Sequence, residues 1–366
     1  MHISINREEL IKPLNQVAGI VERRQTLPIL SNLLIRCQGN QISLTGTDLE
    51  IEVVSQLQGE TDGGGEITIP ARKLLDICRA LPTDAVIKIT VESDKAIVTS
   101  GRSRFTLMTL PTGEFPNLEV GKWDLSLEIQ QDAFKKLLDK TQFCMAQQDV
   151  RYYLNGLLLE FSGKVLRAVG TDGHRLGISE VGLNQDCGET RQIILPRKGV
   201  LELARFMEDK KEKVDIDINA NHIRAKLKEL TVTSKLIDGR FPDYHKVIPS
   251  AQTKLVKVEK EAFKDALNRA AILSNEKFRG LRFNIQKNAM VISAHNPEQE
   301  EAQEEVAIDY SGDELEIGFN SNYVIEAVSA LDSKDVIFGL NDTNSSAVLN
   351  APGDTATKYV VMPMRL

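Results

Sequence analysis

The sequence repeats itself in order along its length, and this repeat limits the possible fold more than any other feature. The tripeptide Gly-Thr-Asp at 46–48 recurs at 170–172, the segment around Pro70 recurs around Pro196, and Phe-Pro at 115–116 recurs at 241–242. The matches keep one order and one spacing of about 125 residues, which indicates tandem copies of one structural unit.

A third copy is fainter and keeps the same order. "AFKKLLDKTQF" (133–143) resembles "AFKDALNRAAI" (262–272), and "TVTSKLI" (231–237) resembles "KYVVMPM" (358–364). The third copy shows no counterpart of the Phe-Pro segment, as expected if that segment links one unit to the next. We therefore expect three domains, at 1–121, 122–249 and 250–366.

Each unit has the sequence pattern of an α+β fold. Pro70 and Pro196 stand where the first turn of a helix tolerates proline. Stretches such as "AIVTSGRSRFTLMTL" and "KVLRAVGTDGHRLGI" are rich in β-branched residues and interrupted by glycine, which is typical of antiparallel hairpins. We predict two helices on one face of an antiparallel sheet in every unit. The stretch 132–145 illustrates a helix, with an apolar stripe and lysines off that stripe: Phe134, Leu137, Leu138, Thr141 and Met145 against Lys135, Lys136 and Lys140.

The composition is that of a globular protein. The 366 residues are 42% hydrophobic and 27% charged, the first residues carry no signal-peptide core, and no window approaches the apolar length of a membrane span. We therefore expect a cytoplasmic protein. The four cysteines form no metal-binding or redox spacing, so we expect reduced thiols, no disulfide, no metal and no cofactor.

The segment "TDGHRL" (171–176) raises the question of catalysis, because Asp172 and His174 lie close together. Catalytic triads are assembled from distant residues, so this proximity is weak support for a hydrolase. The same Thr-Asp occurs at 47–48 without a histidine, which favours a hairpin turn that belongs to the scaffold. No nucleophile elbow, zinc motif or phosphate loop occurs elsewhere, so we expect no catalytic residue.

Several motifs together resemble one family along the whole chain. They are "LPILSNLL", "GTDLE", "QDVRYYLNG", "TDGHRL", "DGRFPDY", "AAILSNEKFRG", "NPEQEEA" and "YVVMPMRL". This set resembles the β subunits of bacterial DNA polymerase III, the replication sliding clamps. The resemblance implies a head-to-tail homodimer that closes into a ring around duplex DNA and tethers polymerases, without catalysis of its own.

Basic residues on successive repeat helices agree with a ring that meets DNA. The net charge is −7, yet the helix at 197–207 and the helix at 72–81 each carry more basic than acidic residues off the apolar stripe, although one such face can be simply a solvated surface. Twelve helices about 10 Å wide would enclose a bore of about 25 to 30 Å. The expected contacts with double-stranded DNA are independent of base sequence: Arg24, Gln147, Gln148, Arg151, Tyr152, Tyr153, Lys198 and Arg205.

Closure of the ring needs an interface between two copies. Ile272 and Leu273 lie off the core stripe of the helix at 262–272, and an acidic segment (298–316) contrasts with the basic "GRSRF" (101–105), which we expect on a strand. These features favour a head-to-tail contact. The expected interface residues are Lys73, Arg102, Arg104, Leu107, Ile272, Leu273, Glu298, Glu300 and Glu301.

The resemblance also implies an apolar pocket that binds short peptide motifs of polymerases, the clamp loader and repair proteins. Methionines suit such a surface because they repack easily around different peptides, although "VVMPM" could also be a plain buried strand. Lys246 replaces an arginine expected from the family and lacks its bidentate fork. The implied lining is Leu154, Thr171, Gly173, His174, Arg175, Leu176, Pro242, Lys246, Val247, Ser346, Val360, Val361, Met362 and Met364.

A hydrolase using Asp172 and His174 and a protein-interaction scaffold that never meets DNA remain as alternatives at this point. Loss of activity on His174→Ala would favour the first. Equal loss from nicked circular and linear DNA would favour the second.

Overall fold

The structure is a computed structural model that describes residues 1–21 and 27–365. The described chain forms two compact units, one of residues 1–129 and 213–236, the other of residues 130–212 and 237–366. These units differ from the three domains expected from the repeat, because strands from neighbouring repeats join in common sheets. The division into three domains therefore stays a statement about the sequence repeat.

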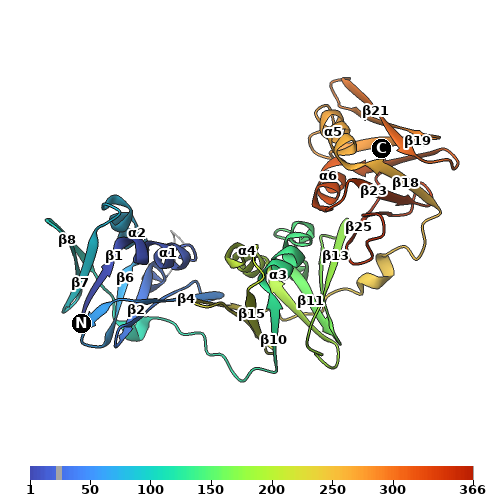
Figure 1. Ribbon diagram of the computed structural model, residues 1–366. Coiled ribbons are helices and arrows are strands. Elements are labelled where there is room, and N and C mark those ends of the chain that lie inside the picture. The colour runs from blue at the N-terminus through green and yellow to red at the C-terminus, as the bar shows by residue number, and fades with distance from the viewer. Residues whose placement is uncertain (22–26, 366) are drawn as a thin grey trace. The chain divides into compact units, whose positions relative to one another are not determined.

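Unit 1 contains helices α1 (Arg7–Ala18) and α2 (Ala71–Ala80), which pack against each other (Figure 1). One antiparallel sheet has the order β5-β1-β7-β8-β9, with β1 His2–Asn6, β5 Glu60–Asp62, β7 Val86–Glu92, β8 Lys95–Ser100 and β9 Ser103–Met108. The other has the order β10-β15-β16-β17-β4-β3-β2-β6, with β2 Asn32–Gln38, β3 Gln41–Thr47, β4 Ile51–Gln58, β6 Gly65–Pro70, β10 Leu125–Gln130, β15 Lys213–Ile218, β16 His222–Lys226 and β17 Leu230–Lys235.

Unit 2 contains the helix pairs α3 (Gln131–Asp139) with α4 (Arg197–Phe206) and α5 (Lys260–Ala271) with α6 (Ser321–Ala330). Its strands form one continuous order, β14-β11-β12-β13-β25-β24-β23-β18-β21-β20-β19-β22. The first strands of this unit are β11 Gly156–Ser162, β12 Val165–Thr171, β13 Arg175–Gly182 and β14 Arg191–Pro196. The later strands are β18 Lys254–Glu259, β19 Gly280–Gln286, β20 Ala289–His295, β21 Glu301–Asp309, β22 Leu315–Asn320, β23 Asp335–Leu340, β24 Ala347–Asn350 and β25 Lys358–Val361.

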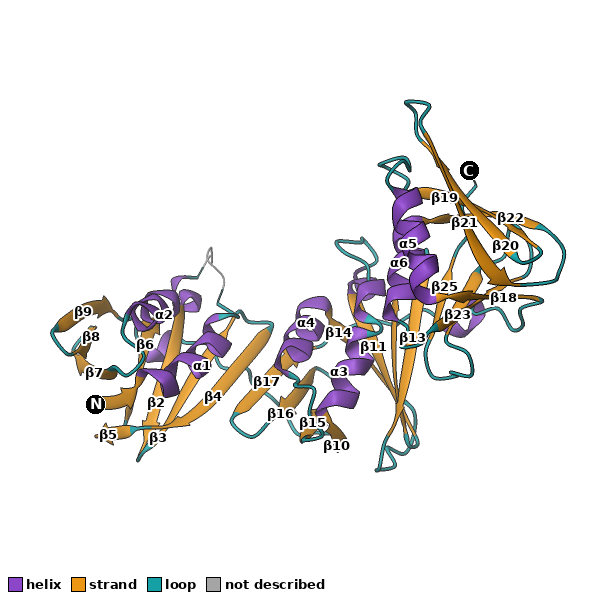
Figure 2. Cartoon of the chain, turned by 45° about the horizontal axis from the view of Figure 1, so that its top comes forward, coloured by secondary structure: helices purple, strands orange, loops and turns teal. Residues whose placement is uncertain are grey.

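Helices cover one face of the strands in each repeat, as the sequence predicts. In the third repeat, α5 contacts β18 to β21 and α6 contacts β22 and β25 (Figure 2). The buried stripe of α5 is Phe263, Ala266, Leu267 and Ala270, and Phe263 packs beside the rings of Phe283 and Phe338. The α+β fold class of tandem units is therefore confirmed.

Local boundaries differ from the prediction in three ways. The helix expected at 132–145 ends at Asp139 and is followed by a 3₁₀ turn, η3 (Gln142–Cys144). Pro70 and Pro196 are N-cap residues and not part of the first turn. A short strand, β1, β10 or β18, precedes the first helix of each repeat. The sequence did not indicate these strands because segments of five or six residues are too short to show a clear period.

No helix within residues 1–21 and 27–365 is long and apolar enough to cross a bilayer.

Candidate functional site

The segment "TDGHRL" forms a tight turn between β12 and β13. The Thr171 hydroxyl donates to the Arg175 carbonyl at 2.6 Å, and the backbone N–H groups of His174 and Arg175 donate to Asp172 Oδ1 at 2.9 and 3.0 Å. Gly173 has φ +91°, a left-handed conformation that a side chain disfavours. Thr171 and Asp172 therefore fix the geometry of the turn through their hydrogen bonds, and Gly173 adopts its left-handed conformation without strain.

The first repeat contains the same turn. Thr47 Oγ1 donates to the Ile51 carbonyl at 2.8 Å, and the N–H groups of Glu50 and Ile51 donate to Asp48 Oδ1 at 2.9 and 2.7 Å. Because the same bonds form without a histidine, the Asp172 carboxylate is explained as a turn residue. The geometry gives no support to a catalytic pair of Asp172 and His174.

An apolar pocket of about 160 Å³ opens beside this turn. It lies where β13 pairs with β25, and the linker that follows β17 forms another wall. The pocket contains Leu154, Leu176 and Val360, which are almost fully buried, and Val247 and Met362, which are partly exposed. Most of the predicted peptide-binding residues line it: Leu154, Thr171, Gly173, His174, Arg175, Leu176, Pro242, Val247, Val360 and Met362.

Four predicted residues lie outside this lining. Val361 points to the opposite face of β25 and is buried in the core of the third repeat, because successive side chains of a strand alternate. Met364 lies farther along the chain and bridges to Gly318. Lys246 is exposed and forms an ion pair with Asp243 at 3.3 Å, and Ser346 is half-buried away from the lining.

Three lining residues were not predicted for the pocket, namely Arg151, Asp243 and Tyr244. Arg151, expected to contact DNA, donates to the Asp172 carbonyl at 3.1 Å and bonds Asp149 through two nitrogens. A Cβ atom on Gly173 would lie 3.0 Å from the Arg151 guanidinium, so glycine permits this contact. Asp243 and Tyr244 directly follow the repeated Phe-Pro segment, and this repeat was the sequence signal that could have assigned them to the pocket.

A polar network beneath the pocket fixes the linker. The Tyr244 hydroxyl donates to Glu160 Oε1 at 3.0 Å, Arg167 donates to the same oxygen at 2.6 Å, and Gln192 donates to Glu160 Oε2. Burial alone would raise the pKa of Glu160, but the bonds from Gln192 and Tyr244 and the Arg167 charge outweigh burial and lower it. The network holds Tyr244 in a buried cluster with Phe241, Leu154 and Leu176.

Arg175 lines the pocket, but its charged group is engaged within the protein. The guanidinium bonds Asp172 at 3.1 Å, pairs with Glu326 of α6, and donates to the Phe143 carbonyl. It also lies over the rings of Phe143 and Tyr323, 5.5 and 4.6 Å from their centroids. Arg175 therefore joins the second repeat to the third, beside the pocket.

The predicted DNA-facing residues that the structure describes lie in the segment before β11 and on helix α4. Arg24 lies outside the described residues. Gln147 and Gln148 are exposed on the loop before η4 (Tyr152–Asn155), Tyr152 is exposed in η4 itself, and Tyr153 is half-buried against the cluster under the pocket. The bond from Arg151 lowers the pKa of Asp149 to about 2, so this pair stays charged at neutral pH.

The predicted basic helix faces are partly neutralised. On α3, Lys135 pairs with Asp209 at 2.8 Å and Lys136 pairs with Asp332 at 2.6 Å, and Lys140, the residue after the helix, also pairs with Asp332 at 3.3 Å. On α4, Arg205 pairs with Glu202 at 2.6 Å and stacks on Phe206, while Lys198 is half-buried. Intramolecular partners are not visible in a helical pattern, which explains why the sequence overstated the positive charge.

The predicted interface residues lie at two strand edges. In unit 1, Arg104 and Leu107 belong to β9, at the end of its sheet, whereas Arg102 lies in the preceding turn and not on a strand as predicted. Lys73 is exposed on α2, and Leu107 is only 8% exposed because it faces the core of this repeat.

In unit 2, Ile272 is 75% exposed just after α5, and Leu273 is half-buried. Glu298 and Glu300 are exposed in the turn before β21, and Glu301 is the exposed first residue of that strand. Among the residues that the structure describes, β21 pairs with β18 only at Ile308 and Asp309, so the remainder of that edge has no strand beside it.

The four cysteines are free thiols, and burial raises the pKa of Cys78 to about 12. Within the described ranges, no group of three or more His, Cys, Asp or Glu side chains has a metal-binding arrangement.

Comparison with known proteins gives matches over the whole chain. Sequence profiles of the DNA polymerase III beta subunit match residues 1–119 (N-terminal domain), 128–243 (central domain) and 245–365 (C-terminal domain). The beta sliding clamps of Pseudomonas putida and Escherichia coli K12 are 52% and 46% identical in sequence to this chain, and each comparison covers both chains completely.

Solved structures agree with the sequence matches. A DNA polymerase sliding clamp from Pseudomonas aeruginosa, crystallised with a ligand, superposes with a TM-score of 0.98 at 50% identity, and the Caulobacter crescentus pol III beta with 0.96 at 35%. Both comparisons cover all of each chain. By repeat, fold and full-length similarity, this chain belongs to the DNA polymerase III β-subunit family.

Proposed function

We propose that the chain is a DNA sliding clamp, a non-catalytic processivity factor that encircles duplex DNA and tethers the replicative polymerase. The observation that carries this proposal is the complete, end-to-end similarity to proteins named beta sliding clamps, at about half-identical sequence. A role in the replication machinery supports a cytoplasmic location.

The ring forms from two copies arranged head to tail. The basic end of β9 in one copy, with Arg102 and Arg104, faces the acidic start of β21 in the other, with Glu300 and Glu301. Ile272 supports this arrangement because a large apolar side chain with three-quarters of its surface exposed gains by burial in an interface. Lys73, Leu107, Leu273 and Glu298 flank the same contact.

DNA passes through the ring with weak, sequence-independent contacts. Gln147, Gln148, Tyr152 and Tyr153 on the loop before β11, together with Arg24, Lys198 and Arg205, are the proposed contacts. Because Arg205 already pairs with Glu202, its contact with a phosphate requires exchange of partners. This supports retention by topology over strong direct affinity.

Partners bind through short apolar peptide segments in the pocket beside Leu176. Support comes from its chemistry: apolar walls, a flexible Met362 at the rim, and a few polar groups at the edge. The exposed His174 offers a contact for a peptide's polar side chains. Val361 is not proposed as a contact, since it faces the core.

Sedimentation with nicked circular plasmid tests the proposal. The protein, loaded by its clamp loader, should sediment with the circle and be released when the plasmid is cut once. A scaffold that never meets DNA would not sediment with either form, and a conventional DNA-binding protein would stay after linearisation. Either result would refute the clamp function.

A further inference from the structure

Strand register defines which residues are equivalent in the three repeats. Asn32 pairs with Pro70 in the first repeat, Gly156 with Pro196 in the second, and Gly280 with Asn320 in the third. Counting from these pairs, position 30 corresponds to 154 and 278, and position 34 corresponds to 158 and 282. The same surface can therefore be compared in all three repeats.

In the first two repeats, a Phe-Pro segment covers this surface. Phe115 is 4% exposed and shares a buried cluster with Leu30 and Leu34. Phe241 is 6% exposed and shares a cluster with Leu154 and Leu158. The covering segment therefore supplies one phenylalanine ring to the same two positions in each repeat.

The third repeat has the same approach path. In the second repeat, the Ile237 N–H donates to the Ile194 carbonyl at 2.9 Å, immediately before the segment reaches Phe241. In the third, the Met364 N–H donates to the Gly318 carbonyl at 2.8 Å, and Gly318 occupies the register position of Ile194.

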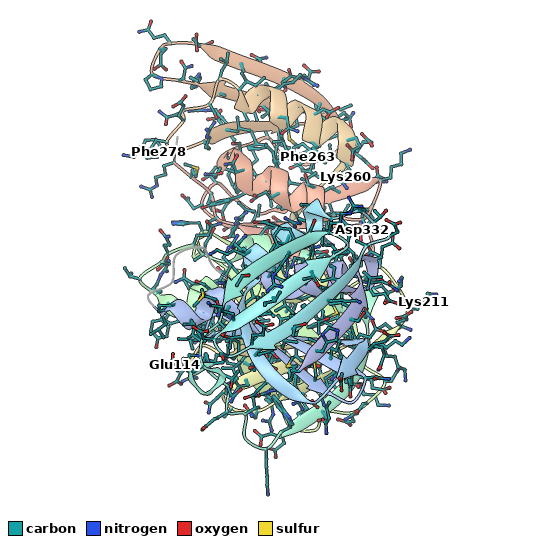
Figure 3. All side chains as sticks on the ribbon, turned by 90° about the vertical axis from the view of Figure 1, so that its left-hand side faces the viewer. Glu114, Lys211, Lys260, Phe263, Phe278 and Asp332 are labelled. Atoms are coloured by element: carbon teal, nitrogen blue, oxygen red, sulfur yellow. The ribbon has the colours of Figure 1, made fainter. Side chains whose placement is uncertain are left out.

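An open slot of about 350 Å³ remains there, lined by Asn275, Phe278, Gly280, Arg282, Ser293, Ala294, His295, Met364 and Arg365. Phe278 is 53% exposed, whereas the equivalent Leu30 and Leu154 are each 2% exposed. Figure 3 shows Phe278 at the periphery of this repeat, away from the core residue Phe263. An exposed phenylalanine beside an apolar depression is a typical partner-binding surface.

We propose that this slot binds an extended segment of another protein that carries Phe-Pro followed by an acidic residue. The phenylalanine would occupy the place that Phe115 and Phe241 occupy in the other repeats, and Pro would keep the segment extended. Arg365 is exposed at the rim of the slot and complements an acidic residue such as the Asp243 that follows Phe241-Pro242, whereas Arg282 in the slot lining is already paired with Glu316 at 2.6 Å.

The slot also continues the proposed peptide pocket. Met362 lines the pocket and Met364 lines the slot, two residues farther along the same extended segment. One partner can therefore use both sites. Binding at the slot itself depends on Phe278 and not on the function proposed for the pocket.

Fluorescence anisotropy with a labelled peptide of the sequence IDGRFPDYH, which repeats residues 237–245, tests the slot in the full-length protein. The peptide should bind, and a peptide with both Phe and Pro replaced by Ala should not. Phe278→Ala should weaken binding about tenfold, as expected for loss of a central aromatic contact. Leu255→Ala is the matched control, because Leu255 is 57% exposed in the same repeat but lies outside the slot.

A second variant, Ser293→Leu, fills the slot with a side chain near the size of Val169, its register equivalent, and should abolish binding. A benzoylphenylalanine replacing the peptide's Phe should cross-link within residues 275–295. Loss of peptide binding on Met362→Ala with no effect of Phe278→Ala or Ser293→Leu would place the peptide in the pocket and overturn the proposal. Absence of binding at millimolar peptide would also overturn it, while plasmid retention by these variants reports separately on the clamp function.

Discussion

Arg175 is expected to determine how firmly the second and third repeats are joined beside the pocket. Its side chain is 11% exposed and contacts Asp172, Glu326, the Phe143 carbonyl and two aromatic rings. Arg175→Met retains much of the aliphatic volume but removes every polar contact. The Phe143 carbonyl loses its donor, at a cost of about 1 to 3 kcal/mol, and the ring contacts lose about 0.5 to 2 kcal/mol.

The total loss for Arg175→Met is therefore about 1.5 to 5 kcal/mol. Arg175→Lys should fall between the methionine variant and the native protein, because an ammonium lacks the fork that reaches several partners at once. Glu326→Gln is the matched control and should cost less than about 1 kcal/mol, since the Glu326 side chain is 46% exposed.

Hydrogen exchange measures this effect locally. The Met362 N–H donates to the His174 carbonyl at 2.9 Å, directly beside Arg175, so its protection reports on the junction of β13 with β25. Arg175→Met should accelerate exchange at Met362 and in β25, and should weaken binding of a pocket peptide. Unchanged protection at Met362 together with unchanged unfolding in urea would refute the assignment of Arg175 as the joining residue.

Three further predictions follow from the same contacts. Ile272→Ala with Leu273→Ala should weaken the dimer by up to about 1.5 to 3 kcal/mol for each fully buried side chain, while leaving the monomer folded; a variant that remains dimeric in sedimentation at nanomolar concentration would contradict the interface. Leu176→Ala should destabilise the fold by about 2 to 5 kcal/mol because Leu176 is 3% exposed. Met362 is 38% exposed, so Met362→Ala should weaken binding of a pocket peptide with little loss of stability in a urea titration, and equal effects of the two variants on stability would contradict the burial argument. Burial alone would raise the pKa of Asp217, but bonds from Lys226, Ser126 and Arg224 lower it to about 2, so its contribution to stability is present above about pH 4 and is lost as pH falls toward 2. The difference in unfolding free energy between the native protein and Asp217→Asn, measured by fluorescence of Trp123 beside Arg224, should therefore narrow on acidification. A constant difference would disprove the shift.

The repeat allowed the sequence to predict the fold class and the nature of the "TDGHRL" turn. The equivalence of Thr47-Asp48 and Thr171-Asp172 separated scaffold residues from those particular to the second repeat, and the hydrogen bonds of both turns agree with this. The alternation of side chains along a strand at 358–361 could also have been used, because it places Val361 on the face opposite to Val360 and so in the core.

Pairing over long distances could not be predicted in the same way. The continuous sheets depend on contacts such as β13 with β25, which are separated by almost half the chain and leave no local period. The ion pairs of Lys136 and Lys140 with Asp332, and of Arg175 with Glu326, also join distant segments. The sequence identified these cations and could not show that each already has a partner.

The rate of release from DNA at increasing salt tests the encircling ring most directly. Protein loaded on closed circular DNA should be released slowly at every salt concentration, because escape requires opening an interface between two copies. The same protein on linear DNA should leave quickly, with direct contacts that weaken steeply as salt rises. Equal release rates and equal salt dependence on circular and linear DNA would contradict the ring.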